Sequence, residues 1–273
     1  MDQVDRNRRI LVFDFDGVIC NSIHDSYVTA LNTYIHFIDD HKLPLSTPLA
    51  SDKVFEFEKE FPETFKSFSD LMPLANCAED YFVLLSLIDQ KRTDQIHCQN
   101  EFNHFKENFS PTQLDEYHKA FYQIRSRMRE ENLEKWLDLL HPFPEMPDTI
   151  RELSDKFTLA ISTSKDRPSV TILLDRYGLM DYFKPENIFD KDLSRSKRDH
   201  IIQLQKESGV PFSRIHFIDD KISHLLSIKD LGVCNYLACW GFNSEREVRI
   251  AIKEGFTPIQ LEDLKHIGNK ILD

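Results

Sequence analysis

The chain has 273 residues, of which 41% are hydrophobic and 29% are charged, as in an ordinary globular protein of one large or two moderate domains. Its formal net charge of -12 argues against binding to a nucleic-acid backbone by bulk electrostatics, and no apolar run approaches membrane-spanning length. The five cysteines lack metal-ligand spacing, and the first residues contain no apolar signal-peptide core. We therefore expect a cytoplasmic protein with reduced thiols that binds neither nucleic acid nor membrane.

The first predicted element is a buried strand that ends in two carboxylates. Residues 10–13 are apolar on both faces, which is typical of a central parallel strand, and Asp14-Phe15-Asp16-Gly17 follows them directly. Side chains alternate along a strand, so Asp14 and Asp16 start toward the same side. Two carboxylates held close together repel each other, so the pair requires a cation or a shared proton.

Residues 22–141 show helical spacing throughout and contain no convincing strand. The apolar residues of the first part share one stripe: Tyr27, Leu31, Tyr34, Ile35 and Ile38. Ser110-Pro111 has the form of a helix start with proline at the first helical position, and it predicts a long helix toward Trp136. Arg125 on this helix is interpreted as part of a solvated face, with a contact to substrate phosphate as the alternative.

Beyond residue 141, strand-like and helix-like segments alternate. The predicted strands are 157–162, 187–189, 214–218 and 233–238, and the predicted helices are 146–156, 167–177, 198–208 and 222–231. This alternation indicates an α/β protein with a Rossmann-like parallel sheet. We expect residues 1–21 and 142–273 to form this core domain, with 22–141 inserted as an all-helical domain.

Four polar features fall at the carboxyl ends of predicted strands. They are the Asp14/Asp16 pair, Thr163-Ser164-Lys165, a basic segment with Lys197, and Asp219-Asp220. Because these ends share one edge of a doubly wound sheet, the features are expected to converge. Each feature alone is also explained by a turn, a helix cap or a solvated charge, but their order favours a site. Carboxylates with a hydroxyl and a lysine suit Mg²⁺ and a phosphate, and such a site could transfer a phosphoryl group.

The same four segments resemble the motifs of the haloacid dehalogenase-like superfamily, in particular of phosphatases similar to phosphoglycolate phosphatase and β-phosphoglucomutase. The first motif is Asp14-Phe15-Asp16-Gly17-Val18, and the second is the apolar strand before Thr163-Ser164-Lys165. The third is Lys197 before a helix, and the fourth is the apolar strand ending in Asp219-Asp220. The resemblance covers the sheet domain almost end to end, whereas residues 22–141 match the family's helical cap only in position and class.

The resemblance implies a role for each motif residue. Asp14 would be the nucleophile that becomes an aspartyl phosphate, and Asp16 would be the general acid and base. Thr163 and Lys197 would bind the phosphoryl oxygens, and Ser164 is grouped with them. Family members often carry asparagine where this chain has Ser164, and Lys-Pro where it has Lys197-Arg198.

The metal and the phosphate-binding lysine also follow from the resemblance. Mg²⁺ would be held by Asp14, Asp219 and the backbone carbonyl of Asp16, with Asp220 as a further ligand or an outer-shell partner. Two other lysines, Lys191 and Lys184, are rivals of Lys197 for the phosphate contact; Lys197 is preferred because a helical pattern follows it directly.

The sequence thus predicts an Mg²⁺-dependent phosphatase that hydrolyses a small phosphorylated metabolite through an aspartyl-phosphate intermediate. A phosphomutase of the same superfamily shares these catalytic residues and is one alternative. A non-catalytic binding or scaffold protein that has kept the fold is the other. The close Asp14/Asp16 pair argues against a scaffold, which has no use for clustered charges.

Overall fold

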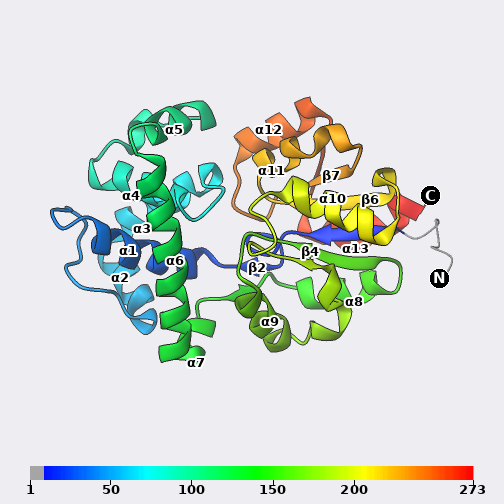
Figure 1. Cartoon of the computed structure of the whole chain (residues 1–273), viewed down its shortest axis with the longest axis horizontal. Coiled ribbons are helices and arrows are strands. Elements are labelled where there is room, and N and C mark those ends of the chain that lie inside the picture. The colour runs from blue at the N-terminus through cyan, green and yellow to red at the C-terminus, as the bar shows by residue number, and fades with distance from the viewer. Residues whose placement is uncertain (1–8, 273) are drawn as a thin grey trace. The chain divides into compact units, whose positions relative to one another are not determined.

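The computed structural model describes residues 9–272, which fold into two compact units (Figure 1). The core unit comprises the chain up to Asn21 and from Pro142 onward, and the inserted unit comprises Ser22–His141. The chain leaves the core unit after β2 (Cys20–Asn21) and returns through β3 (His141–Pro142). The inserted unit is therefore one uninterrupted stretch of sequence.

The core unit is built on a six-stranded parallel sheet, counted over residues 9–272, with strand order β5-β4-β1-β6-β7-β8. Its strands are β1 (Ile10–Phe13), β4 (Thr158–Ser162), β5 (Ile188–Phe189), β6 (Ile215–Asp219), β7 (Cys234–Ala238) and β8 (Thr257–Ile259). The strand order reverses beside β1, and ligands of open α/β sheets bind at the carboxyl ends next to such a reversal. The predicted α/β, Rossmann-like fold is confirmed.

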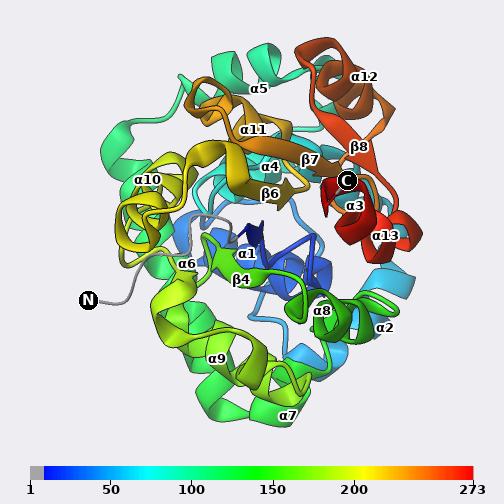
Figure 2. The same ribbon diagram turned by 90° about the vertical axis from the view of Figure 1, so that its right-hand side faces the viewer.

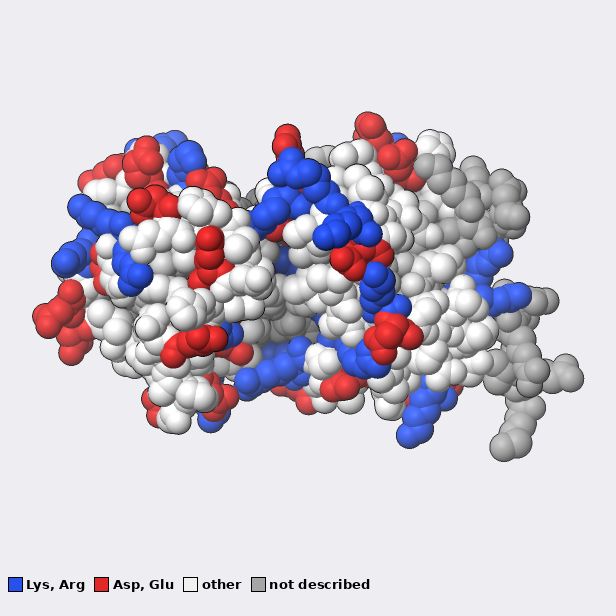
Figure 3. Space-filling view, turned by 90° about the horizontal axis from the view of Figure 1, so that it is seen from above, with Lys and Arg blue, Asp and Glu red and all other residues white. Residues whose placement is uncertain are grey.

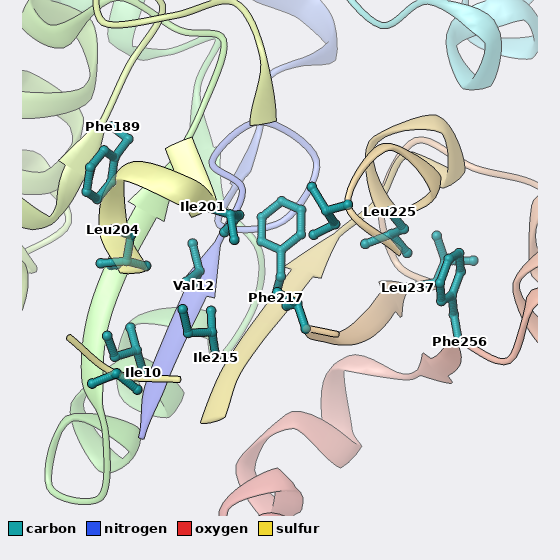
Figure 4. Close-up of a cluster of buried hydrophobic side chains, with 14 of the residues drawn as sticks. Ile10, Val12, Phe189, Ile201, Leu204, Ile215, Phe217, Leu225, Leu237 and Phe256 are labelled. Atoms are coloured by element: carbon teal, nitrogen blue, oxygen red, sulfur yellow. The ribbon is translucent and has the colours of Figure 1, made fainter. Parts of the chain in front are cut away.

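Helices cover both faces of this sheet (Figure 2). They are α8 (Met146–Ser154), α9 (Arg167–Arg176), α10 (Lys197–Ser208), α11 (Ile222–Ser227), α12 (Glu245–Glu254) and α13 (Leu261–Leu272). On one face, Val12 and Phe217 pack with Ile201 and Leu204 of α10 in a buried apolar cluster (Figure 4). The neighbouring Phe13 points to the opposite face, where its ring meets Phe183 at 6.3 Å. β1 is apolar on both sides because both sides are covered.

The C-terminal part of the core unit differs from the sequence prediction. The strand β8 was not predicted because it has three residues with Pro258 at its centre, and proline is confined to edge strands such as this one. Helix α12 was not predicted either, although Ser244 and Glu247 form a capping box at its start. Helix α11 ends at Ser227 rather than continuing to residue 231.

The inserted unit is helical over the described chain. Its helices are α1 (Ile23–Phe37), α2 (Val54–Glu60), α3 (Pro62–Leu71), α4 (Asp80–Asp89), α5 (Gln99–Lys106), α6 (Pro111–Glu131) and α7 (Leu133–Leu137). The side chain of Ser110 accepts the backbone N–H of Gln113, so the predicted helix start is confirmed. The helix does not reach Trp136: Asn132 is extended, and its side chain caps the separate helix α7 by accepting the N–H of Lys135.

Arg125 is buried in the inserted unit, so its interpretation as a solvated residue was wrong. It is 4% exposed, and its Nη2 lies 2.9 Å from Oδ2 of Asp25 on α1. Trp136 Nε1 donates to the other oxygen of Asp25 at 2.8 Å. The guanidinium also lies over the Phe121 ring, 4.6 Å from its centroid. The pair joins α1, α6 and α7 inside the unit's core.

The surface carries charges of both signs. On the face seen in Figure 3, Lys and Arg side chains are interspersed with Asp and Glu. Among residues 9–272, no helix has both the length and the apolar character needed to cross a membrane.

We predict that Arg125→Met destabilises the protein by about 3–5 kcal/mol, because it leaves the buried Asp25 carboxylate without its counter-charge. Arg127→Met, at an exposed position of the same helix, is the matched control and should change stability by less than about 0.5 kcal/mol. Urea denaturation of the two variants beside the wild type measures the difference. Equal urea-denaturation midpoints for the two variants would show that the buried Arg125–Asp25 pair does not contribute to stability.

Candidate active site

Two buried carboxylates lie level with each other at the ends of adjacent strands. In the parallel register of β1 and β6, Phe13 pairs with Ile218, so Asp14 and Asp219 come next on each strand. The Asp14 N–H donates to the Ile218 carbonyl at 2.9 Å, which fixes this alignment. Asp14 is 5% exposed and Asp219 is fully buried. The sequence placed these residues on one sheet edge, and the structure brings them together.

Lys197 is the cation that faces this pair. It is the first residue of α10, whose start is capped by Ser196, and it is buried. Its Nζ lies 2.7 Å from Asp14 Oδ1 and 3.6 Å from Asp219 Oδ2, and it donates to the Ser162 carbonyl. Burial opposes the charge on Lys197, but the Asp14 and Asp219 carboxylates raise its pKa above the usual value. Burial raises the pKa of Asp14, and Lys197 counteracts this effect.

The two rival lysines have other positions. Lys191 follows β5 but bonds to Asp192 at 2.5 Å. Lys184 is exposed and precedes β5, so it belongs to the amino end of that strand, opposite the site. Of the three candidate lysines, Lys197 is the one that pairs with Asp14.

Asp16 is held by a lysine that the sequence analysis did not select. Lys165 is buried and lies 2.9 Å and 3.2 Å, through Nζ, from the two carboxylate oxygens of Asp16. The turn at Gly17, with φ of 82°, carries Asp16 away from the buried strand, and its side chain is 29% exposed. A signal was present in the sequence, because Lys165 closes the segment that was identified as the second motif.

The segment after β4 brings the predicted hydroxyl residues to the same edge. The Thr163 N–H donates to Phe189 of β5 at 2.9 Å, and its Oγ1 accepts the N–H of Lys165 at 3.0 Å. Thr163 is buried, whereas Ser164 is partly exposed. The backbone in this segment is thus fixed by hydrogen bonds beside Asp16.

Asp219 has a second neighbour, His224, which sequence reasoning missed. His224 Nδ1 lies 3.0 Å from Oδ2 and 3.1 Å from Oδ1 of Asp219, and the Lys221 N–H donates to Oδ1 at 2.8 Å. Burial favours the neutral acid, but His224 and Lys197 lower the pKa of Asp219 to about 2. In the described chain, Asp14, Asp219 and His224 each offer one ligand atom, all within 4.8 Å of one another.

The Asp220 side chain packs tightly against Gly17 and Gly241. It is not part of the group of ligand atoms formed by Asp14, Asp219 and His224. A Cβ at Gly17 or Gly241 would lie less than 3.0 Å from the Asp220 side chain. Its Oδ2 accepts the Phe242 N–H at 2.7 Å, while its buried Oδ1 has no hydrogen-bond partner among the described residues. Burial raises the pKa of Asp220 to about 6. Trp240 Nε1, from the same loop, donates to Val18 at 3.0 Å.

The donor set fits a divalent cation. Asp14, Asp219 and Asp220 are three buried carboxylates within a small region. Burial raises the pKa of Asp14 and of Asp220, whereas His224 and Lys197 lower the pKa of Asp219. The Asp14 Oδ1 is engaged by Lys197 and by the Phe15 N–H, whereas Oδ2 has no hydrogen bond within residues 9–272. Carboxylate oxygens are the ligands that hard divalent cations prefer, so a bound cation would compensate this charge.

Comparison with known proteins places these features in one family. A model of the haloacid dehalogenase-like hydrolases matches residues 9–232. Magnesium-dependent phosphatase 1 of Homo sapiens is 29% identical over 93 residues, which are 33% of this chain and about half (51%) of that relative.

Solved structures share the whole fold at low sequence identity. A haloacid dehalogenase-like hydrolase from Streptococcus pneumoniae has a TM-score of 0.61 at 16% identity, covering 96% of this chain and 98% of its own. A predicted phosphoglycolate phosphatase from Haemophilus somnus has a TM-score of 0.62 at 16% identity, covering 95% and 97%.

We predict that Gly241→Ala destabilises the protein by about 1–3 kcal/mol, because the added methyl group would overlap the Asp220 side chain and the Gly17 carbonyl. Gly232→Ala is the matched control, since a Cβ there meets open space and only the φ of 81° opposes it, at about 1 kcal/mol. Thermal unfolding compares the two. A Gly241→Ala protein as stable as the wild type would contradict the tight packing at Asp220.

Proposed function

Because the chain belongs to the haloacid dehalogenase-like hydrolase family, as its motifs predicted, we propose that it is a phosphomonoester hydrolase, that is, a phosphatase. The observation that carries the proposal is the buried ion pair between Asp14 and Lys197, which lies beside Asp219. Asp16 forms an ion pair with a different lysine, Lys165. The names of two similar proteins, magnesium-dependent phosphatase 1 and a predicted phosphoglycolate phosphatase, support the same reaction.

Asp14 and Asp16 have environments suited to different tasks. Asp14 is buried at the strand end with Oδ2 unengaged by any described residue, and we assign it as the nucleophile. Its oxygen forms a bond to phosphorus as the bond to the leaving alcohol breaks, and Asp16 supplies the proton to that alcohol. Asp16 then takes a proton from water, which attacks the aspartyl phosphate and releases phosphate and free Asp14. The partly exposed carboxyl group of Asp16 suits exchange of a proton with substrate and water.

Thr163, Ser164 and Lys197 are assigned to the phosphoryl oxygens. Lys197 already pairs with the nucleophile, so its charge lies where a phosphate would approach Asp14. Thr163 and Ser164 follow the neighbouring strand β4 at the same sheet edge. A cation and hydroxyl donors fixed before the substrate arrives stabilise the negative charge of the transferred group without reorganisation.

The proposed cofactor is Mg²⁺, held by Asp14, Asp219 and the backbone carbonyl of Asp16. When bound, the ion would screen the repulsion between an anionic nucleophile and an anionic phosphate. Asp220 is assigned as an outer partner, since its carboxylate packs against Gly17 and Gly241. We further propose that residues 22–141 form the cap domain that selects a small phosphorylated metabolite as substrate.

Asp14→Asn is expected to lower phosphate release by about 10⁴–10⁶-fold while the fold is retained, because the amide is not a competent nucleophile. Release of phosphate from p-nitrophenyl phosphate and from a panel of phosphorylated metabolites measures this loss. Asp155→Asn, at an exposed end of α8, is the control. Near-normal turnover by Asp14→Asn would refute the assignment. An isomerised sugar phosphate without free phosphate would identify a phosphomutase instead.

Chelation of divalent cations is expected to abolish turnover, and added Mg²⁺ is expected to restore it. Asp219→Asn should raise the Mg²⁺ concentration for half-maximal activity by more than about tenfold, because a charged ligand of the ion is lost. Asp230→Asn, an exposed carboxylate paired with Arg198, should leave it unchanged. Full activity in the presence of a chelator would refute the metal requirement. No turnover of any metabolite together with no bound metal would favour a scaffold.

A further inference from the structure

His224 lies in the first turn of α11, directly after the strand that ends in Asp219. Its side chain is 16% exposed, and its ring contacts the fully buried Asp219 carboxylate through Nδ1. A histidine at this place adds an imidazole nitrogen to a site otherwise composed of oxygen donors and lysines. None of the assigned catalytic or phosphate-binding roles uses this residue.

The distances match those between ligands of one metal ion. Neighbouring ligands in an octahedral shell with bonds of about 2.1 Å lie about 3.0 Å apart. His224 Nδ1 lies 3.0 Å from Asp219 Oδ2, and a ligand atom of Asp14 completes a group that spans 4.8 Å or less. Imidazole and both carboxylates therefore lie at positions that one cation could share.

The imidazole can present Nδ1 to a cation in place of the Asp219 hydrogen bond. A histidine that binds a metal through Nδ1 carries its proton on Nε2. Nε2 of His224 makes no hydrogen bond to another residue in the part of the chain that the structure describes, and the side chain is partly exposed. Without an ion, Nδ1 donates to the Asp219 carboxylate. A bound cation would take the place of that proton, and the proton of the neutral imidazole would then lie on Nε2.

We propose that His224 is a further direct ligand, through Nδ1, of the divalent ion assigned to this site. The site then also accepts a transition-metal ion such as Mn²⁺, and His224 adds more to the affinity for Mn²⁺ than to that for Mg²⁺. The inference rests on the proposed function in taking Asp14 and Asp219 as the other protein ligands. Imidazole is a softer donor than carboxylate and favours transition metals, whereas Mg²⁺ prefers oxygen and water. Lys197 contacts Asp14 through Oδ1 at 2.7 Å, which leaves Oδ2 of Asp14 for an ion.

Pulsed electron paramagnetic resonance of Mn²⁺ bound to the full-length protein tests the proposal. A directly coordinated imidazole gives nitrogen modulation of the electron spin echo, and labelling the histidines with ¹⁵N changes that modulation. We expect this modulation in the wild type, its loss in His224→Asn, and its retention in His104→Asn, an exposed histidine of the inserted unit. Bound Mn²⁺ without histidine nitrogen coupling in the wild type overturns the proposal, even if no variant can be purified.

Calorimetric titration adds a second readout that a purely structural role would not move. His224→Asn should weaken Mn²⁺ binding by about tenfold more than Mg²⁺ binding, because the transition metal gains more from the imidazole. Equal losses for both ions would mean that His224 acts only by orienting Asp219, which overturns the proposal. The proposed function can fail independently of this proposal. That is the outcome if bound Mn²⁺ shows histidine nitrogen coupling but the protein releases no phosphate in an Asp14-dependent reaction.

Discussion

The ion pair between Asp14 and Lys197 is the interaction on which the rest of the site depends. Asp14 is buried because β1 is the central strand of a covered sheet, and an unpaired carboxylate there would be costly. Lys197 reaches it because α10 packs its Ile201 and Leu204 against the same face of the sheet. The apolar packing of α10 therefore sets the position of the charge that faces the nucleophile.

The loops around this pair are fixed by close contacts to Asp220. Gly17 and Gly241 lack the side chains that would displace its carboxylate, and the Phe242 N–H holds one oxygen. Trp240 bonds to the loop after β1 as well. The turn that carries Asp16 and the loop after β7 thus share one buried acid. This arrangement gives the second acidic residue of the fourth motif a structural role in addition to its charge.

Four basic side chains lie next to the acidic residues of the site. Lys197 faces Asp14 and, at a longer distance, Asp219; Lys165 faces Asp16. His224 contacts Asp219, and Lys221 neighbours Asp220 in sequence. Each carboxylate therefore has its own electrostatic environment, which is the condition for acids of the same type to perform different tasks. The inserted unit keeps its own buried pair, Arg125 with Asp25, as part of its core.

The sequence by itself determined the parallel α/β core and the strand ends that carry Asp14, Thr163 and Asp219, because buried strands and their polar ends leave a local pattern. It favoured Lys197 over Lys191 and Lys184 from the helical pattern that follows Lys197, but the contact with Asp14 itself depends on how α10 packs across the sheet. The same holds for the pairing of Lys165 with Asp16 and for the packing of Asp220 against Gly17 and Gly241, which join distant segments. His224 lies only five residues after Asp219, but its contact depends on how the chain turns from β6 into α11. It also missed β8 and the end of α6 at Glu131, where an edge position and the cap at Asn132 outweigh local periodicity. The end of α6 follows from the local cap at Asn132. Tertiary packing decided the contacts between distant segments, because a side chain's partner across the sheet is not encoded in its own neighbours.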